Sequence, residues 1–294
     1  MHELNSAARP VYVLAISGGV DSMVLAETIG AMRTRITVIA HFDHGIRKES
    51  GQDEAFVRAY AERRGLVYVT EKSNLGHRAS EEKARDARYA FLRRVQKQYG
   101  AVAIVTAHHQ DDVIETMCIN MLRGTGWRGL ISLRSHPELV RPLLGMSKAQ
   151  LVAYAVHHNI EWVEDRTNDD PRYLRNTIRQ TVMRRMTSAQ RQAFVDLYHK
   201  QLLLGTDIDG HVSVVQQKVS STTGLSRYHL IMMPRTVGAE VLQGSVSEGR
   251  LERPQINRLL HFAKTAKAGK KLTVAKGLMA RVTDDELIVY TPEI

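Results

Sequence analysis

The most specific chemical feature of the chain is a short polar run that follows an apolar segment. Its residues, in order, are Ser17, Gly18, Gly19, Val20, Asp21 and Ser22. Two glycines let the backbone approach a bulky anion, and the start of a helix offers unpaired N–H groups and a positive dipole end. The serine hydroxyls add donors. The run therefore predicts a phosphate-binding loop; the plainer alternative is that Asp21 and Ser22 only cap a helix.

A carboxylate inside such a loop has a specific implication. Asp21 would repel phosphate unless Mg²⁺ lies between them, so it is a candidate magnesium ligand. The run is not a Walker loop, because G-x-x-x-x-G-K-[ST] is absent from the chain and the run has no lysine.

Two further polar clusters follow apolar segments. They are His41–Arg47 and Ala107–Thr116. The carboxyl ends of parallel strands share one edge of a sheet, so we expect the three motifs to converge there. On a helix that begins near Asp111, the side chains of Asp111, Asp112 and Glu115 can face one side. Acids in a first turn also suit the helix dipole, which would account for one aspartate without any function.

The elements that must position these motifs alternate. Expected strands cover Val11–Ile16, Ile36–Phe42, Leu66–Thr70 and Val102–Ala107, and expected helices cover about Ser22–Met32, Asp53–Gly65, Glu81–Tyr99 and Asp111–Leu122. Strands that are apolar throughout and alternate with helices indicate an α/β fold with a parallel sheet covered on both faces.

The pattern changes after about residue 186. A helix is expected over Thr187–Gly205. Later strands are expected near His211–Val219, Tyr228–Met233, Lys271–Val274 and Glu286–Tyr290, and later helices near Val237–Val246 and Pro254–Ala266. We therefore expect a catalytic α/β domain over residues 1–205 and a small α+β domain over residues 206–294.

Composition limits the remaining choices. The chain has 294 residues, and 41 Lys and Arg against 31 Asp and Glu give a net charge of +10. This charge favours a polyanionic partner such as nucleic acid. The lone Cys118 excludes an internal disulfide and a C-x-x-C site, which fits a reducing compartment. We expect a cytoplasmic protein with no membrane association, because no leader or spanning segment is recognisable.

The basic residues cluster in two segments. Between residues 171 and 195 the chain has no acid and six arginines: Arg172, Arg175, Arg179, Arg184, Arg185 and Arg191. The first three are spaced for one helical face, and such a stripe contacts phosphates whatever the sequence of the nucleic acid. A second patch, Arg250–Arg281, holds nine Lys and Arg and one acid, and would extend the contact onto the small domain.

The polar run resembles the PP-loop of N-type ATP pyrophosphatases, whose pattern is S-G-G-x-D-S. Further segments make the chain similar to the tRNA(Ile)-lysidine synthetase family. They run in family order from about residue 11 to residue 186: Ser17–Ser22, His41–Arg47, Ala87–Leu92, Ala107–Thr116, Leu122–Leu130, Arg141–Leu144 and Glu164–Arg179.

This resemblance implies a reaction. ATP, with Mg²⁺, adenylates the ring carbonyl oxygen of the wobble cytidine in the CAU anticodon of tRNA(Ile). The side-chain amine of free L-lysine then displaces AMP at ring carbon 2, giving lysidine, AMP and pyrophosphate. The oligomeric state stays open, with a homodimer as one alternative.

The resemblance also implies roles for single residues. The loop Ser17–Ser22 would hold ATP, with Asp21 near Mg²⁺ and His41 lining the adenine. Arg88 and His108 would lie near the phosphates and the activated base.

The lysine end of the site would be acidic. Asp112 and Glu115 would hold the ammonium, and one of them, preferentially Asp112, would take its proton, because an amine with a pKa of about 10.4 is otherwise protonated. The RNA contacts would come from Arg172, Arg175, Asn176 and Arg179.

The chain departs from the family pattern in places. Asp43 stands where the family motif His-x-Asn-His has asparagine, and Ser132 stands where glycine is usual. Longer members carry a further domain, so we expect discrimination against tRNA(Met) to depend on fewer contacts here.

Three alternatives remain. One is a 2-thiolating PP-loop enzyme, for which Cys118 alone cannot supply a cysteine pair. Another is a non-catalytic tRNA-binding module. The third is a metal-dependent phosphoesterase built from His41, Asp43, His44, His108, His109, Asp111 and Asp112.

Overall fold

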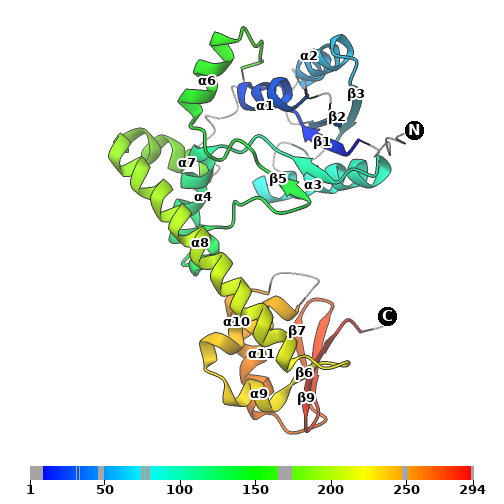
Figure 1. The fold of residues 1–294 in the computed structure, drawn as a ribbon, viewed down its shortest axis with the longest axis vertical. Helices are drawn as coiled ribbons and strands as arrows, with labels where there is room; N and C mark the ends of the chain where they lie inside the picture. Colours follow the sequence, from blue (N-terminus) through cyan, green and yellow to red (C-terminus); the bar gives the residue numbers. More distant parts are fainter. Residues whose placement is uncertain are drawn as a thin grey trace, which may run out of the picture. The chain divides into compact units, whose positions relative to one another are not determined.

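The computed structural model describes residues 9–30, 32, 34–45, 50–73, 76, 80–164, 174–246 and 251–292. The chain forms two compact units, Met1–Gln201 and Leu202–Ile294, each with its own sheet (Figure 1). Within the described ranges, no helix is both long and apolar enough to cross a membrane.

The first unit is built on a parallel sheet in the order β3-β2-β1-β4-β5. Its strands are β1 (Val11–Ala15), β2 (Ile36–Asp43), β3 (Val67–Lys72), β4 (Ala103–Val105) and β5 (Leu139–Val140). The predicted α/β class is confirmed, and the four expected strands are present. Sequence patterning missed β5, because two residues are too short for a periodic signal.

The sheet is accompanied by helices, the last of which continues into the second unit. They are α1 (Val20–Gly30), α2 (Ser50–Arg63), α3 (Glu81–Gln98), α4 (Gln110–Leu122), α5 (Trp127–Leu130), α6 (Lys148–His157), α7 (Leu174–Thr181), the 3₁₀ turn η2 (Met183–Arg185) and α8 (Ser188–Val219).

Neighbouring strand residues belong to two different cores. Leu14 and Ile39 pack in a cluster with residues of α1, α2 and α6. Val13 and Val38 pack in another cluster with residues of α3. Because successive side chains of a strand point to opposite faces, both faces of the sheet are buried. This double burial explains why the strands are apolar throughout.

The second unit contains the end of α8 and an antiparallel sheet in the order β6-β9-β8-β7. The remaining elements are β6 (Leu225–Ser226), α9 (Arg227–Met232), α10 (Arg235–Ser245), α11 (Arg253–Thr265), β7 (Lys271–Ala275), β8 (Leu278–Val282) and β9 (Glu286–Tyr290).

Two segments predicted as strands are helical, and those predictions were wrong. The first, His211–Val219, continues α8 beyond Gly205. Val212, Val215 and Val219, spaced by three and four residues, pack against the core of the second unit. This helical spacing outweighs the strand preference of β-branched residues.

The second such segment, Tyr228–Met233, forms most of α9. Leu230 is fully buried, whereas Tyr228 and Met232 remain exposed. A short apolar run of this kind cannot be assigned to strand or helix by periodicity alone. The strand β8 was not predicted.

The polar run forms a tight turn between β1 and α1. Gly18 has a φ of 96°. The Ser22 hydroxyl accepts hydrogen bonds from the backbone N–H groups of Ser17, at 3.2 Å, and Gly18, at 3.1 Å, and donates to the Gly19 carbonyl at 2.8 Å. The hydroxyl of Ser22 therefore holds the shape of the loop.

Replacing Gly18 with alanine should lower the free energy of unfolding by roughly 1–2 kcal/mol, since a side chain at this φ is strained. A Cβ there would also lie 3.4 Å from Val57. Urea denaturation followed by circular dichroism measures the change. Gly19→Ala is the matched control, because its Cβ would meet only the Ser17 hydroxyl, at 3.7 Å. An equal loss in both variants would contradict the argument.

Candidate active site

A pocket of about 200 Å³ lies at the carboxyl ends of β1, β2 and β4. Its lining residues come from the three strand ends and from α1, α3 and α4: Ala15, Ile16, Ser17, Gly19, Asp21, Ser22, Ala40, Phe42, Arg88, Leu92, Thr106, Ala107, His108 and Asp112. The structure thus brings together the motifs that the sequence placed at separate strand ends, as expected for a parallel sheet.

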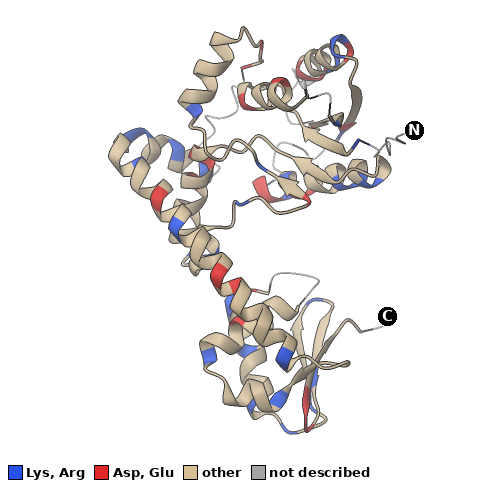
Figure 2. Ribbon diagram, in the orientation of Figure 1, with Lys and Arg blue, Asp and Glu red and all other residues tan. Residues whose placement is uncertain are grey.

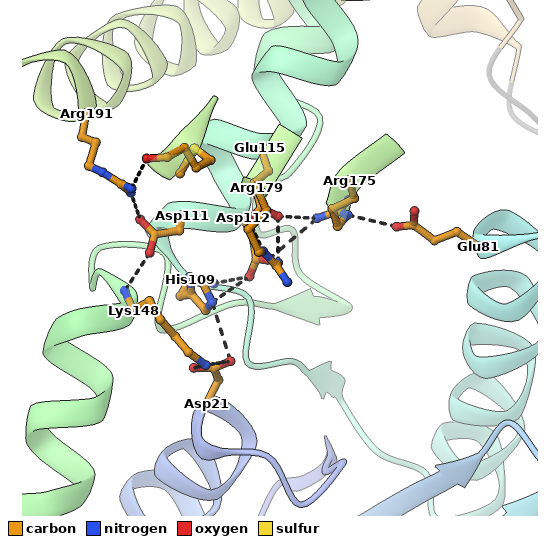
Figure 3. A network of polar contacts seen from close by, with 11 residues as sticks. Asp21, Glu81, His109, Asp111, Asp112, Glu115, Lys148, Arg175, Arg179 and Arg191 are labelled. Carbon is orange, nitrogen blue, oxygen red and sulfur yellow. Dashed lines mark hydrogen bonds and ion pairs between the residues drawn. The ribbon is translucent and has the colours of Figure 1, made fainter. Parts of the chain in front are cut away.

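Asp21 is held by a lysine from a distant helix. Lys148 Nζ lies 2.7 and 2.8 Å from the two carboxylate oxygens of Asp21 (Figure 3). His109 Nε2 lies 3.6 Å from Asp21 Oδ2. The loop has no lysine of its own, and Lys148 at the start of α6 places an ammonium group beside it. Sequence reasoning missed Lys148 because 127 positions separate it from Asp21.

The surroundings of Asp21 suit a magnesium ion. The carboxylate lies on the pocket wall with 26% of its side chain exposed, and both of its oxygens accept from the Lys148 ammonium, so a magnesium ion would take the place of a cation that is already there. One carboxylate together with phosphate oxygens and waters is a donor set that Mg²⁺ uses.

The metal-dependent phosphoesterase finds no support in this geometry. All seven side chains that it would use are described. Across the described part of the chain, no group of three or more His, Cys, Asp or Glu is placed to hold a metal.

The side chain of His41 does not line the pocket. It is 4% exposed, and its Nδ1 lies 2.9 Å from the Ile16 carbonyl, so His41 joins β2 to the strand end before the loop. From β2, Ala40 and Phe42 line the pocket instead. Val20 and Gly18 also contribute to the turn rather than to the pocket lining.

Arg88 reaches the pocket from α3. Its guanidinium carbon lies 5.7 Å from the centre of the Tyr89 ring, and within the described ranges it makes no ion pair. Burial lowers the pKa of Arg88, and the cations Arg85 and Arg175 lower it further. A half-buried guanidinium without a carboxylate ion pair is suited to bind an anionic ligand.

His108 is electrically neutral at physiological pH. Its Nδ1 lies 2.8 Å from the Thr106 hydroxyl. Burial lowers the pKa of His108 to about 3, against the pull of Asp112 and with help from Arg88 and Arg141. An imidazole in this state can donate or accept a hydrogen bond at the pocket without carrying charge.

Asp112 caps its own helix and also faces the pocket. Its Oδ2 accepts a hydrogen bond from the His109 N–H at 2.9 Å, so the capping alternative holds for this residue. Its Oδ1 faces α7, with Arg175 at 3.8 Å and Arg179 at 4.0 Å. Burial acts to raise the pKa of Asp112, but the two histidines, the His109 N–H and Arg175 outweigh it, so the pKa is lowered.

Glu115 is the most deeply buried acid of the cluster, with 2% of its side chain exposed. Arg179 Nε donates to Oε1 at 2.7 Å, and a second guanidinium nitrogen donates to Oε2 at 3.0 Å. Arg175 lies 3.5 Å from Oε2. Burial raises the pKa of Glu115 even though Arg179 acts in the opposite direction.

Asp111 makes structural contacts to two other helices and does not line the pocket. Its Oδ2 accepts the backbone N–H of Lys148 at 3.1 Å, and its Oδ1 accepts Arg191 at 2.9 Å. Arg191 also donates to the Met183 carbonyl at 2.6 Å. Asp111 therefore joins α4 to the starts of α6 and α8.

The expected basic stripe of Arg172, Arg175 and Arg179 is not fully exposed to solvent where the structure describes it. Arg175 pairs with Glu81 at 3.0 Å as well as with the α4 carboxylates, and Asn176 is buried. Arg172 lies outside the described residues. Two of the three stripe arginines thus contact the acidic cluster.

Basic residues continue into the second unit (Figure 2). Some of them hold its fold: Arg258 donates to the carbonyls of Thr273 and Val274, and Lys264 donates to those of Ile231 and Met233. The predicted patch is therefore partly structural.

The unusual Asp43 is charge-compensated. Its side chain is 2% exposed, its Oδ1 accepts the Gly45 N–H at 2.8 Å, and its Oδ2 lies 3.6 Å from Lys72 Nζ. Ser132, the other departure, accepts a hydrogen bond from Asn120 at 3.0 Å.

A family model described as the PP-loop domain matches residues 2–186. The chain belongs to the PP-loop family. It is 43% identical over 182 residues to a tRNA(Ile)-lysidine synthase of Thermus thermophilus, covering 60% of this chain and 36% of the relative. It is 41% identical over 175 residues to the enzyme of that name from Novosphingobium aromaticivorans, covering 56% and 54%. The chain thus matches about a third to a half of these relatives.

A solved structure shares this PP-loop fold. The U34-tRNA thiolase NcsA from Methanococcus maripaludis, with its [4Fe-4S] cluster, aligns with a TM-score of 0.52 at 15% identity. The alignment covers 67% of this chain and 72% of the other.

The low pKa of His108 predicts a pH effect on stability. Between pH 6.5 and about 3, His108 is protonated in the unfolded chain and neutral in the folded chain. The free energy of unfolding therefore falls as the pH falls through this window, by at most about 1.4 kcal/mol per pH unit from this histidine. His108→Gln should flatten the unfolding free energy across that window. Unchanged pH dependence in the variant would contradict the assignment, and the exposed His261→Gln is the control.

Proposed function

We propose that the chain attaches free L-lysine to ring carbon 2 of the wobble cytidine in the CAU anticodon of tRNA(Ile), using ATP through an adenylated RNA. The observation that carries this proposal is one pocket lined both by the glycine loop after β1 and by Asp112, with the carboxylate of Glu115 close to that of Asp112 through their shared contact with Arg175. The names of the two relatives agree with it.

The loop end would bind the triphosphate. The loop around Gly19, the Ser17 hydroxyl and Arg88 line the pocket and would supply donors and positive charge for phosphate oxygens. Lys148, which pairs with Asp21, would add positive charge beside them. Asp21 would hold Mg²⁺, which when bound offsets negative charge on the phosphates. Neutral His108 lines the same pocket as the loop and Asp112, where it would hydrogen-bond the base as its carbonyl oxygen is adenylated.

The carboxylate end would bind the lysine. The ammonium must lose a proton before its nitrogen attacks carbon 2, and AMP then leaves with the former carbonyl oxygen. Asp112 lines the pocket and its pKa is lowered, so it is ionised, and its position makes it the carboxylate that would take that proton. Glu115 lies behind it and adds negative charge that favours the ammonium.

The thiolation alternative has less support. Cys118 lies on α4 and is half-buried, and burial raises the pKa of its thiol. A protonated thiol is a weak nucleophile and a weak cluster ligand. The RNA contacts that we propose come from Arg172, Arg175, Asn176, Arg179 and the second unit.

The experiment combines the protein, Mg²⁺, ATP and radiolabelled lysine with unmodified tRNA(Ile) bearing CAU, and in parallel with elongator tRNA(Met). Label in tRNA(Ile) alone, with AMP released, is the expected result. Release of AMP and pyrophosphate without any label in RNA would reject lysine as the nucleophile.

Asp112→Asn should separate the two chemical steps. Without a base, lysine transfer should fall roughly 10²–10⁴-fold, while pyrophosphate release on tRNA continues. Single-turnover reactions with labelled ATP and labelled lysine measure both steps. Full lysine transfer by the variant would reject Asp112 as the base.

Lys148→Met should slow pyrophosphate release about 10²-fold, because a cation facing the phosphates is lost. Thermal stability should change little, since the lysine side chain is 44% exposed. Arg94→Met is the control, because Arg94 forms a comparably exposed pair with Glu71 at 2.7 Å on the same unit. Equal rates in the two variants would contradict a role for Lys148.

A further inference from the structure

Two arginines of α7 occupy the carboxylates to which an amine substrate would bind (Figure 3). Arg179 takes both oxygens of Glu115, at 2.7 and 3.0 Å. Arg175 lies 3.5 Å from Glu115 and 3.8 Å from Asp112. Guanidinium and ammonium groups compete for carboxylate oxygens because both are cationic hydrogen-bond donors.

Glu115 already has Arg179 and Arg175 beside it, so a substrate ammonium cannot bind there equally well while Arg179 stays in place. The Glu115 side chain is 2% exposed, so water screens a third positive charge poorly. Removing Arg179 without a replacement would also be unfavourable, because the buried carboxylate would keep only the more distant Arg175, at 3.5 Å, as a counter-charge. Exchange of one cation for the other avoids both costs.

We propose that Arg179 is an internal competitor of the amine substrate and that RNA phosphates draw it away, so that lysine binds after the RNA. This inference rests on the proposed function and adds an order of binding to it. In this order of binding, the amine reaches Glu115 only after Arg179 has moved to an RNA phosphate.

The helix that carries Arg179 can stay in place while the side chain moves. The helix itself is anchored by Ile178, which is 2% exposed and packs with Ile114 and Met183, and by the buried Asn176. The Arg179 side chain is 33% exposed, so it already borders solvent from which a phosphate can approach. Arginine binds phosphate through the same paired N–H groups that it uses for carboxylate.

A further geometric feature supports this order. Arg175 contacts Glu81 of α3 at 3.0 Å in addition to the α4 acids. It therefore remains as a partial counter-charge near Asp112 and Glu115 when Arg179 leaves. The carboxylate pair is thus never without a neighbouring cation while the ammonium enters.

Equilibrium dialysis of radiolabelled L-lysine against the full chain tests the inference. Without RNA, Arg179→Gln should bind lysine at least about tenfold more tightly than the wild type, because the competing state is removed. With the CAU tRNA(Ile) transcript and a non-hydrolysable ATP analogue, the wild type should approach the affinity of the variant. Arg191→Gln is the matched control: this arginine is also 33% exposed and pairs with Asp111 instead.

The outcomes separate the two proposals. Equal lysine affinity of wild type and Arg179→Gln without RNA would overturn the competition and leave the proposed reaction intact. If Arg191→Gln also bound lysine more tightly than the wild type, the competition would be overturned too. The higher affinity would then come from a general loosening of the structure around the acidic cluster. Absence of lysine binding in every protein, even with RNA and the ATP analogue, would reject lysine as substrate and with it both proposals.

Discussion

Two carboxylates buried on the first turns of α4 need positive charge beside them, and this need organises the side chains around the pocket. Glu115 receives it from Arg179, and Asp112 receives it from Arg175 together with a hydrogen bond from the backbone N–H of His109. The helices that carry these groups come from distant parts of the sequence. In our proposal the same carboxylate pair is the site at which a substrate ammonium replaces an arginine, because a buried carboxylate that loses one cation needs another.

The same electrostatic balance links the two ends of the pocket. His109 Nε2 lies 3.6 Å from Asp21 and 3.5 Å from Asp112, so one buried imidazole faces both the phosphate loop and the acidic cluster. Asp21 in turn holds Lys148, whose backbone N–H binds Asp111. Binding of a phosphate-bearing ligand at the loop would therefore alter charges that the acidic cluster also experiences.

Much of this could be predicted from the sequence, because the signals are local. Apolar runs gave the strands of the first sheet, and the residues Ser17–Ser22 marked the loop. The convergence of strand ends followed from parallel topology. The partners Lys148, Arg191 and Glu81 carry no local pattern, because their roles depend on packing between distant helices. The prediction of a strand at His211–Val219 was wrong for a related reason. Its valines lie on one face of a helix and pack against the core of the second unit, and that core is formed by residues distant in the sequence.

A crystal structure of the chain with a non-hydrolysable ATP analogue, Mg²⁺, lysine and the anticodon stem-loop of tRNA(Ile) would test the central claim most directly. The account predicts the triphosphate at Ser17–Ser22 and the lysine amine at Asp112 and Glu115, both within the one pocket. It would be contradicted by a triphosphate bound away from the loop, or by an amine bound elsewhere while Arg179 still covers Glu115.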